Sequence, residues 1–223
     1  MKSRWLKMLT VIATVAMVQS TQLNVSAAEY HEPVILDDSL SVEEMFFDKV
    51  DDDRVLPMPG GGFLHGSCVV VDARDESRIL GIYNSRLDPN AVSIEEAKRI
   101  LAGETKYVSV AARGATIPTG WDLYFLGANE HYLSGEFSAS GWRFSNYMFK
   151  PASGTGDYLR WTSINDSGRV GGYEDAQNTL NGIVSGMELP IGQSRWYSKG
   201  SAGQIYYTYN PVTGTKYLVE NPC

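Results

Sequence analysis

The sequence has few of the residues from which metal sites and nucleophilic sites are built. It contains two cysteines, Cys68 and Cys223, and three histidines, His31, His65 and His131. Neither residue type has the close spacing of a zinc site, so we expect no metal and no other cofactor. In an oxidising compartment two cysteines usually form one bridge, and we predict a disulfide between Cys68 and Cys223. A free thiol at Cys68 and an intermolecular bridge through Cys223 are the alternatives.

The sequence also lacks an apolar run long enough to cross a bilayer. The apolar stretch near the N-terminus, Met8–Val18, has 11 residues, whereas a spanning helix needs about 20. Three basic residues precede this stretch and small residues follow it, which is typical of a cleavable signal peptide. We therefore predict a signal peptide over residues 1–28, cut after Ala27 or Ala28, and a secreted, extracellular protein without a stable membrane anchor.

An excess of positive charge is missing as well. The formal net charge is −7. Residues 29–54 hold ten acidic and two basic side chains, a local net charge of −8, and residues 55–223 are close to neutral. Nucleic acids and anionic membranes bind to positive surfaces, so neither is an expected partner. Nothing in the composition points to an oligomeric state.

Prolines and glycines divide the rest of the chain. Residues 57–62 read Pro-Met-Pro-Gly-Gly-Gly and are predicted to be a linker, because proline and glycine runs interrupt regular structure. The acidic lead-in or pro-segment, residues 29–56, precedes it, and a single β-rich domain over 63–223 follows. Ser41 and Glu44 fit a capping box and predict a short helix in the acidic segment. We favour a helix packed on its own domain over an inhibitory pro-segment.

The predicted fold is β-rich, mainly an antiparallel sandwich or barrel, with one defined α-helix near residues 94–102. Ser93 and Glu96 form a second capping box before that helix, and Gly103 follows it. Short apolar runs separated by turn residues then recur about every ten residues, which indicates antiparallel strands. An α+β fold is the alternative. Beyond the helix, strands are predicted near 106–112, 121–127, 131–138, 142–149, 157–164, 194–199, 204–210 and 215–219.

Aromatic side chains are abundant in the β-rich half, and they occupy both faces of several predicted strands. A two-sheet sandwich buries one face of each sheet, so we expect some rings to be exposed. Exposed Tyr and Trp rings suit stacking on sugars or anchoring a protein partner. The alternative at each position is a ring that fills the core. The predicted ligand-binding residues are Trp121, Trp142, Trp161, Trp196 and Tyr206.

Two carboxylates and a histidine form the candidate catalytic group. Glu130 and His131 follow a turn, and Glu136 lies on the strand after it, so the three groups could converge at one sheet edge. Paired carboxylates can catalyse glycoside hydrolysis. Charged side chains at strand ends are, however, ordinarily solvated surface. These residues are weak catalytic candidates, and an enzyme is not the favoured interpretation.

Our leading hypothesis is a secreted, non-catalytic recognition protein that binds an extracellular glycan or protein through exposed Tyr and Trp. One alternative is a secreted hydrolase that uses carboxylates and His131. Another is a secreted toxin or antimicrobial protein that the acidic pro-segment keeps inactive.

Overall fold

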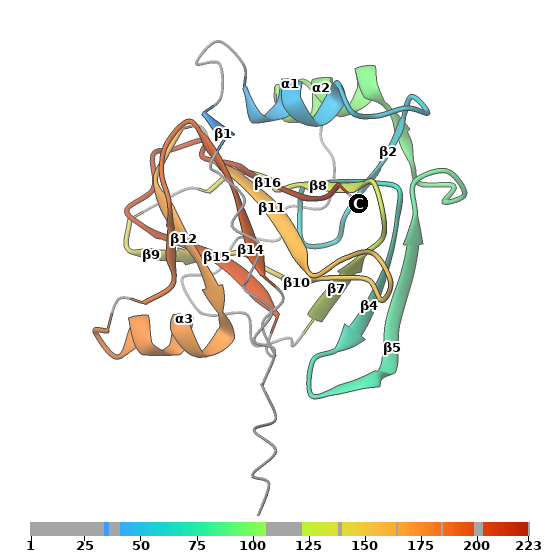
Figure 1. Cartoon of the computed structure of the whole chain (residues 1–223). Coiled ribbons are helices and arrows are strands. Elements are labelled where there is room, and N and C mark those ends of the chain that lie inside the picture. The colour runs from blue at the N-terminus through green and yellow to red at the C-terminus, as the bar shows by residue number, and fades with distance from the viewer. Residues whose placement is uncertain are drawn as a thin grey trace, which may run out of the picture. The chain divides into compact units, whose positions relative to one another are not determined.

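The protein folds as two stacked β-sheets with helices on their outer faces (Figure 1). The computed structural model describes residues 34–35, 41–105, 122–137, 140–163, 165–183, 185–198 and 203–222. The predicted β-rich, mainly antiparallel sandwich is thereby confirmed. None of the helices in these described segments is long and apolar enough to cross a membrane.

The first sheet is antiparallel throughout its described pairs and brings the N-terminal and C-terminal strands together. Its strands lie in the order β1 (Val34–Ile35), β14 (Gln193–Ser198), β11 (Tyr158–Ser163), β16 (Tyr217–Asn221), β8 (Glu130–Leu133), β3 (Phe63–His65), β2 (Arg54–Pro57) and β6 (Val92–Ser93).

The second sheet is mixed, because β10 and β7 run parallel whereas the other described pairs are antiparallel. Its strands lie in the order β13 (Met187–Leu189), β12 (Gly168–Gly172), β15 (Gln204–Tyr209), β10 (Met148–Pro151), β7 (Asp122–Leu126), β4 (Ser67–Asp72) and β5 (Asp75–Asn84). A further strand, β9 (Trp142–Phe144), also pairs with β15.

Aromatic rings fill the space between the two sheets. Trp161 is fully buried there, and its ring packs edge-on against Phe149 with 5.5 Å between centroids. The indole Nε1 of Trp161 donates a 2.8 Å hydrogen bond to Gln204 Oε1, which satisfies the polar atom of the buried ring. Tyr132 and Tyr217 belong to the same cluster, with 6.3 Å between their ring centroids. Closely packed aromatic rings therefore form the main core.

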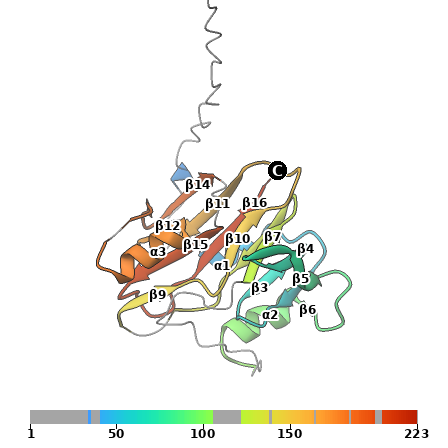
Figure 2. The ribbon, with the colours of Figure 1, turned by 90° about the horizontal axis from the view of Figure 1, so that it is seen from below.

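Helices cover the outer faces of both sheets, so the molecule has more than two layers. The helices α1 (Val42–Phe47) and α2 (Ile94–Leu101) lie on the side of the first sheet (Figure 1). The helix α3 (Tyr173–Leu180) packs against β12 and β15 of the second sheet, as Figure 2 also shows. Each outer face thus has its own apolar cluster in addition to the core between the sheets.

The acidic segment contributes to the apolar cluster on the outer face of the first sheet. The capping box predicted at Ser41 and Glu44 is present, and α1 begins there. Phe46 is fully buried and shares a cluster with Leu133 and Leu218 of the first sheet. The helix is therefore part of the folded body.

The second predicted helix is also present, over Ile94–Leu101. Ser93 caps it by accepting a hydrogen bond from the backbone N–H of Glu96 at 3.2 Å. The carboxylate of Glu96 accepts a bond from Arg99 at 3.1 Å. The prediction of a capping box at Ser93 and Glu96 was therefore half right: Ser93 is the N-cap, but the described contact of the Glu96 carboxylate is with Arg99.

The proline and glycine segment 57–62 is a hairpin turn between β2 and β3. Pro57 pairs with Phe63, and the N–H of Met58 donates to the carbonyl oxygen of Gly62 at 3.0 Å. Gly62 has a φ of +84°, a left-handed conformation that glycine adopts without strain. The segment predicted as a linker is therefore an ordered turn that joins two neighbouring strands of the first sheet.

Several predicted strands have different limits in the structure. The run 142–149 is divided into β9 and β10, and β8 ends at Leu133. The predicted strand at 106–112 lies outside the described residues. The strands β1, β2, β3, β6, β12 and β13 are additional elements.

Candidate functional site

A row of side chains crosses the first sheet at right angles to its strands. Each residue of the row is the register partner of the next one on the neighbouring strand. Directly opposed residues lie on the same face of a sheet, so their side chains are neighbours. We call this set the polar row, and its members in spatial order are His65, His131, Glu220, Arg160 and Trp196.

The polar row lies on the outer face of the first sheet, next to α1. Leu133 and Leu218 are two positions away from His131 and Glu220, respectively, and share their face because side chains alternate along a strand. Both leucines pack in the cluster beneath α1. Lys49 follows the end of α1 and reaches Glu220 from there. The helix thus covers one flank of the row.

Glu220 is the charged centre of the polar row. Its side chain is 1% exposed. Arg160 Nε donates a 2.8 Å hydrogen bond to Glu220 Oε2, Lys49 Nζ contacts Oε1, and His131 Nδ1 lies 3.4 Å from Oε1. Burial by itself would raise the pKa of Glu220, but the contacts with His131, Arg160 and Lys49 outweigh burial and lower the pKa to about 2. The carboxylate is therefore ionised at neutral pH.

The two histidines form the buried end of the row. Their rings stack with 5.6 Å between centroids and 6° between planes. His65 Nε2 lies 3.0 Å from Asp51 Oδ1 and 3.4 Å from Asp52 Oδ1. Arg86 holds both carboxylates through bonds of 2.9 Å to Asp51 Oδ1 and 2.6 Å to Asp52 Oδ2. The hydrogen bond from Arg86 is the main cause of the lowered pKa of Asp51.

Asp51, Asp52 and His65 have the donor types of a divalent-cation site. One ligand atom from each residue lies within 4.8 Å of the other two. In the structure, however, the guanidinium of Arg86 already forms ion pairs with both carboxylates. We therefore interpret this cluster as an ion-pair network that fastens the segment after α1 to the loop after β5.

The other end of the polar row is open to solvent. The side chain of Arg160 is 24% exposed, and its guanidinium carbon lies 5.7 Å from the centroid of the Trp196 ring. A cation over an aromatic face is attracted by the quadrupole of the ring. Trp196, which is partly exposed, is thus held against Arg160 at the surface.

Glu130 lies on the opposite face of β8 from His131, and its carboxylate has a structural role. Its Oε1 accepts hydrogen bonds from the N–H of Ser67 at 2.5 Å and from Ser67 Oγ at 2.6 Å, and Oε2 accepts one from the N–H of Gly127. A Cβ atom at Gly66 or Gly127 would come within 2.6 to 2.7 Å of the Glu130 side chain. The carboxylate therefore joins two turns.

Glu136 makes an ion pair of its own. Lys216 Nζ lies 3.0 Å from Glu136 Oε1 and 2.6 Å from Glu43 Oε1. The side chain of Glu136 is 51% exposed. In their described contacts, Glu130, His131 and Glu136 thus bind three different sets of partners.

The five predicted ligand-binding rings divide into buried, partly exposed and undescribed positions. Trp161 and Tyr206 are both 0% exposed in the core between the sheets, so neither presents its ring at the surface. Trp142 and Trp196 are partly exposed. Trp121 lies outside the described residues.

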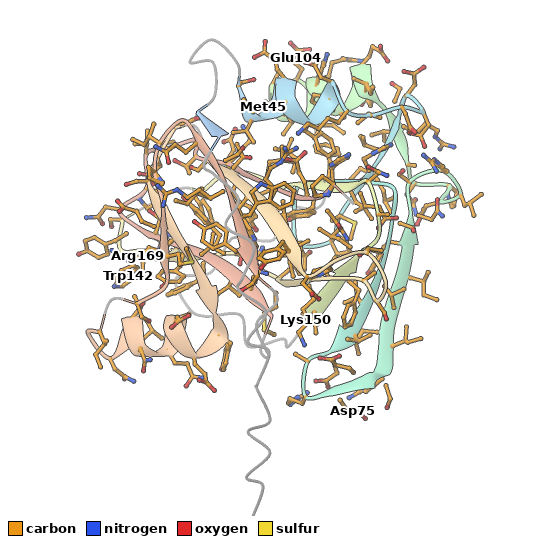
Figure 3. All side chains as sticks on the ribbon, in the orientation of Figure 1. Met45, Asp75, Glu104, Trp142, Lys150 and Arg169 are labelled. Atoms are coloured by element: carbon orange, nitrogen blue, oxygen red, sulfur yellow. The ribbon has the colours of Figure 1, made fainter. Side chains whose placement is uncertain are left out.

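Trp142 belongs to a ladder of rings on the outer face of the second sheet. Tyr209 is its register partner on β15, with 5.1 Å between ring centroids, and Tyr209 is 59% exposed. Phe144 and Tyr207 continue the same face and are fully buried. Arg169, the register partner of Tyr207, lies beside them (Figure 3). We call Phe144, Tyr207, Trp142 and Tyr209 the aromatic ladder. Phe144 and Tyr207 form its buried end, and Trp142 and Tyr209 form its exposed end.

A pocket of about 310 Å³ lies at the start of α3. Strands β12, β13 and β15 of the second sheet and the end of β14 from the first sheet contribute to its walls. Gln204 Nε2 donates to the carbonyl oxygens of Tyr197 at 3.1 Å and Ser198 at 2.9 Å, so the two sheets are tied together beside it. The lining residues are Val170, Gly171, Gly172, Asp175, Gly186, Met187, Tyr197, Ser198, Gly203 and Gln204.

Cys68 is a buried thiol on β4, where its backbone pairs with Tyr83 and Leu126. Burial raises the pKa of this thiol, and the nearby charge of Glu130 raises it further. The thiolate is thus disfavoured at neutral pH. Cys223 lies outside the described residues, so the predicted bridge stays a prediction.

No protein-family model matches the chain, and no curated protein or solved structure matches it significantly.

Sequence reasoning found His131, Trp142 and Trp196 but missed the groups that organise them. Glu220 and Arg160 are charged residues inside otherwise uncharged strands, and that contrast was a usable signal for a buried ion pair. The pocket at the start of α3 gave a weaker signal, because its walls come from strands that are distant in sequence.

Proposed function

We propose that the protein is a secreted, non-catalytic recognition protein that binds an extracellular glycan or protein through the exposed end of the aromatic ladder. The observation that carries the proposal is the cross-strand pair of Trp142 and Tyr209. Two adjacent rings on paired strands form an amphipathic surface, which suits stacking on a sugar or anchoring a protein side chain.

The surroundings of this pair support a rigid binding surface. The N–H of Gly141 donates to Asn210 Oδ1 at 2.6 Å, and the N–H of Asn210 donates to the carbonyl oxygen of Gly141 at 2.9 Å. Both bonds join Gly141 to Asn210, the neighbours of Trp142 and Tyr209 at one end of this strand pair. Rings that are already ordered lose little conformational entropy when a ligand binds.

Trp196 offers a second ring on the first sheet. Its contact with Arg160 fixes the ring, and the guanidinium adds a hydrogen-bond donor for a polar ligand group. We assign it a secondary role, because Glu220 already neutralises Arg160.

The hydrolase alternative has weaker support. A glycosidase needs a carboxylic acid that retains its proton near neutral pH. Glu220, the carboxylate beside His131, has a pKa of about 2 and is ionised. Glu130 accepts three hydrogen bonds that favour its role as an anchor.

The toxin alternative also has weaker support. It requires the acidic segment to leave the body, whereas α1 buries Phe46 in the first sheet and β2 pairs with β3 and β6. A cut near Arg54 would remove part of the hydrophobic core. We therefore propose that the acidic segment is retained in the secreted protein.

The test compares the wild-type protein with the double variant Trp142→Ala, Tyr209→Ala on an array of glycans and a panel of extracellular proteins. Loss of two central rings is expected to cost at least about 2 kcal/mol of binding energy, roughly thirtyfold in affinity. Ile183→Ala is the control, because this side chain is 60% exposed and apolar but outside the ladder. Absence of wild-type binding to every probe, or unchanged affinity in the double variant, would refute the proposal.

A further inference from the structure

The pocket at the start of α3 is separate from the aromatic ladder. Gln204 and Tyr206 point into the space between the sheets, whereas Ile205 and Tyr207 lie on the outer face with the ladder. Gln204 lines the pocket at the beginning of β15, and Tyr209 ends that strand. Five residue steps along a strand correspond to about 17 Å. A molecule of one sugar unit therefore cannot contact both places.

The size and walls of the pocket suit a small organic ligand. Its 310 Å³ is at the lower end of the roughly 300–1,000 Å³ that is common for ligand sites. Val170, Met187 and Tyr197 supply an apolar wall. Asp175, Ser198 and the backbone of several glycines supply polar groups. Such a mixture of apolar and polar walls is typical of a specific binding pocket.

The polar groups of the pocket select the chemistry of the ligand. Asp175 Oδ2 accepts a 2.8 Å hydrogen bond from the N–H of Gly172, and a carboxylate offers about four acceptor sites. Acceptor capacity is thus available for donors on a ligand. Asp175 places a carboxylate in the described lining of the pocket, and a carboxylate attracts hydroxyl donors and repels anions. A neutral molecule with several hydroxyl donors fits this arrangement.

Gly172 lines the pocket, and its backbone conformation does not require glycine. Its φ is −75°, which other residues adopt readily, and it occupies the N-cap of α3, a position that glycine shares with Ser, Thr, Asn and Asp. A Cβ atom there would meet only Asp175 Oδ2 at 3.8 Å and the carbonyl oxygen of Gly203 at 4.0 Å. Gly203, by contrast, has a φ of +69°. A larger side chain at position 172 would therefore enter open space without backbone strain.

We propose that this pocket binds a neutral, polyhydroxylated ring, the size of a single sugar unit, with Asp175 accepting hydrogen bonds from its hydroxyls. The apolar wall of Met187 and Tyr197 contacts the C–H face of the ring. The site is independent of the aromatic ladder and does not need it for binding.

The experiment titrates the full chain with a panel of neutral monosaccharides, namely glucose, galactose, mannose and N-acetylglucosamine, and follows backbone amide resonances by NMR. At least one sugar is expected to shift the amides of Gly172, Ser198 and Gly203 in a saturable way. Shifts confined to the region of Trp142 and Tyr209, or no saturable shift with any of the four sugars, would overturn the proposal.

Variants distinguish this site from the proposed function. Gly172→Leu fills the pocket and is expected to weaken monosaccharide binding at least tenfold, whereas Gly172→Ala adds one methyl group in open space and is expected to change it less than about threefold. Asp175→Asn retains an acceptor for the cap and is expected to weaken binding severalfold. The Trp142→Ala, Tyr209→Ala protein should bind the monosaccharide normally. Equal binding by Gly172→Leu and wild type would refute the pocket and leave the ladder proposal standing. Weakened monosaccharide binding by Gly172→Leu, together with unchanged glycan and protein binding by the Trp142→Ala, Tyr209→Ala protein, would refute the ladder alone.

Discussion

Replacement of Glu220 by Gln tests the energetic importance of the polar row. Glutamine has nearly the same shape but no charge, so Arg160 and Lys49 lose the carboxylate that now balances them. The glutamine amide has an NH₂ group in place of one carboxylate oxygen. In either orientation of the amide, this donor faces a neighbouring cation or His131. The substitution thus removes ionic contacts without creating a cavity.

The magnitude follows from the pKa of Glu220. Its pKa falls from 4.5 to about 2, and each unit corresponds to about 1.4 kcal/mol, so the ionised form stabilises the fold by about 3 kcal/mol. Removal of one partner of a buried ion pair typically costs about 3 to 5 kcal/mol, which agrees with this value. The side chain is 1% exposed, so solvent screening is small.

The sign of the pH dependence is also defined. Because the pKa is lower in the folded state than in the unfolded state, the stabilisation is complete above about pH 4.5 and is lost as the pH falls toward 2. Glutamine does not titrate. The difference in unfolding free energy between wild type and Glu220→Gln should therefore be largest near neutral pH and should shrink between pH 4.5 and pH 2.

Urea unfolding followed by tryptophan fluorescence, at several pH values from 7 to 2.5, measures this difference. Glu136→Gln is the matched control, because that carboxylate is also paired with a lysine but is 51% exposed. An exposed pair contributes at most about 1 kcal/mol. If Glu220→Gln unfolds within 1 kcal/mol of wild type at pH 7, or if the difference does not depend on pH below 4.5, our account of the polar row is wrong.

Two further predictions concern the acidic segment and the secreted form. Phe46→Ala should lower the unfolding free energy by about 3 to 5 kcal/mol, because a fully buried ring leaves a cavity under α1; Leu180→Ala on α3, where the side chain is 51% exposed, should cost much less in the same urea titration. Intact mass spectrometry of secreted protein should give a chain that begins near Ala28 or Glu29 and gains 2 Da on reduction if Cys68 and Cys223 are bridged. A chain that begins near Val55, or an unchanged mass on reduction, would contradict the retained segment or the bridge, respectively.

Local signals in the sequence were sufficient for the helices near the N-terminus. Ser41 with Glu44 and Ser93 each predict a helix start, because capping involves residues three positions apart. The hairpin at 57–62 was not predicted, because its order depends on distant contacts. Gly60 lies so close to Tyr147 that a Cβ atom would come within 1.7 Å of the Tyr147 hydroxyl. Proline and glycine in this segment therefore serve a tight turn and a close approach.

The burial of Trp161 and Tyr206 between the sheets was not predicted, because alternation along a strand does not show which of its two faces meets the other sheet. A sandwich of two bare sheets would leave one face of each sheet in solvent. Helix α3 covers the outer face of the second sheet, so Phe144 and Tyr207 are buried on that face while Tyr206 is buried on the other. A third layer of this kind comes from tertiary packing, and an alternating strand pattern does not reveal it.

The polar row could not be predicted because it depends on register between distant strands. His65 and Glu220 come from opposite ends of the body, yet His131 stands between them as the register partner of both. Glu130 precedes His131 directly in sequence but belongs to the opposite face of the strand. Proximity in sequence therefore suggested the wrong carboxylate as the neighbour of the histidine, and the structure supplies Glu220 instead.

The arrangement of β15 explains why the two proposed binding places can be tested separately. Gln204 fixes one end of this strand to the first sheet through Tyr197 and Ser198, and Tyr209 holds Trp142 at the other end. Both sets of binding groups therefore rest mainly on paired strands, which hold them in place before a ligand arrives. Because side chains alternate along β15, Gln204 of the pocket and Tyr209 of the ladder project from opposite faces of the sheet. A ligand at one place should leave the affinity of the other unchanged.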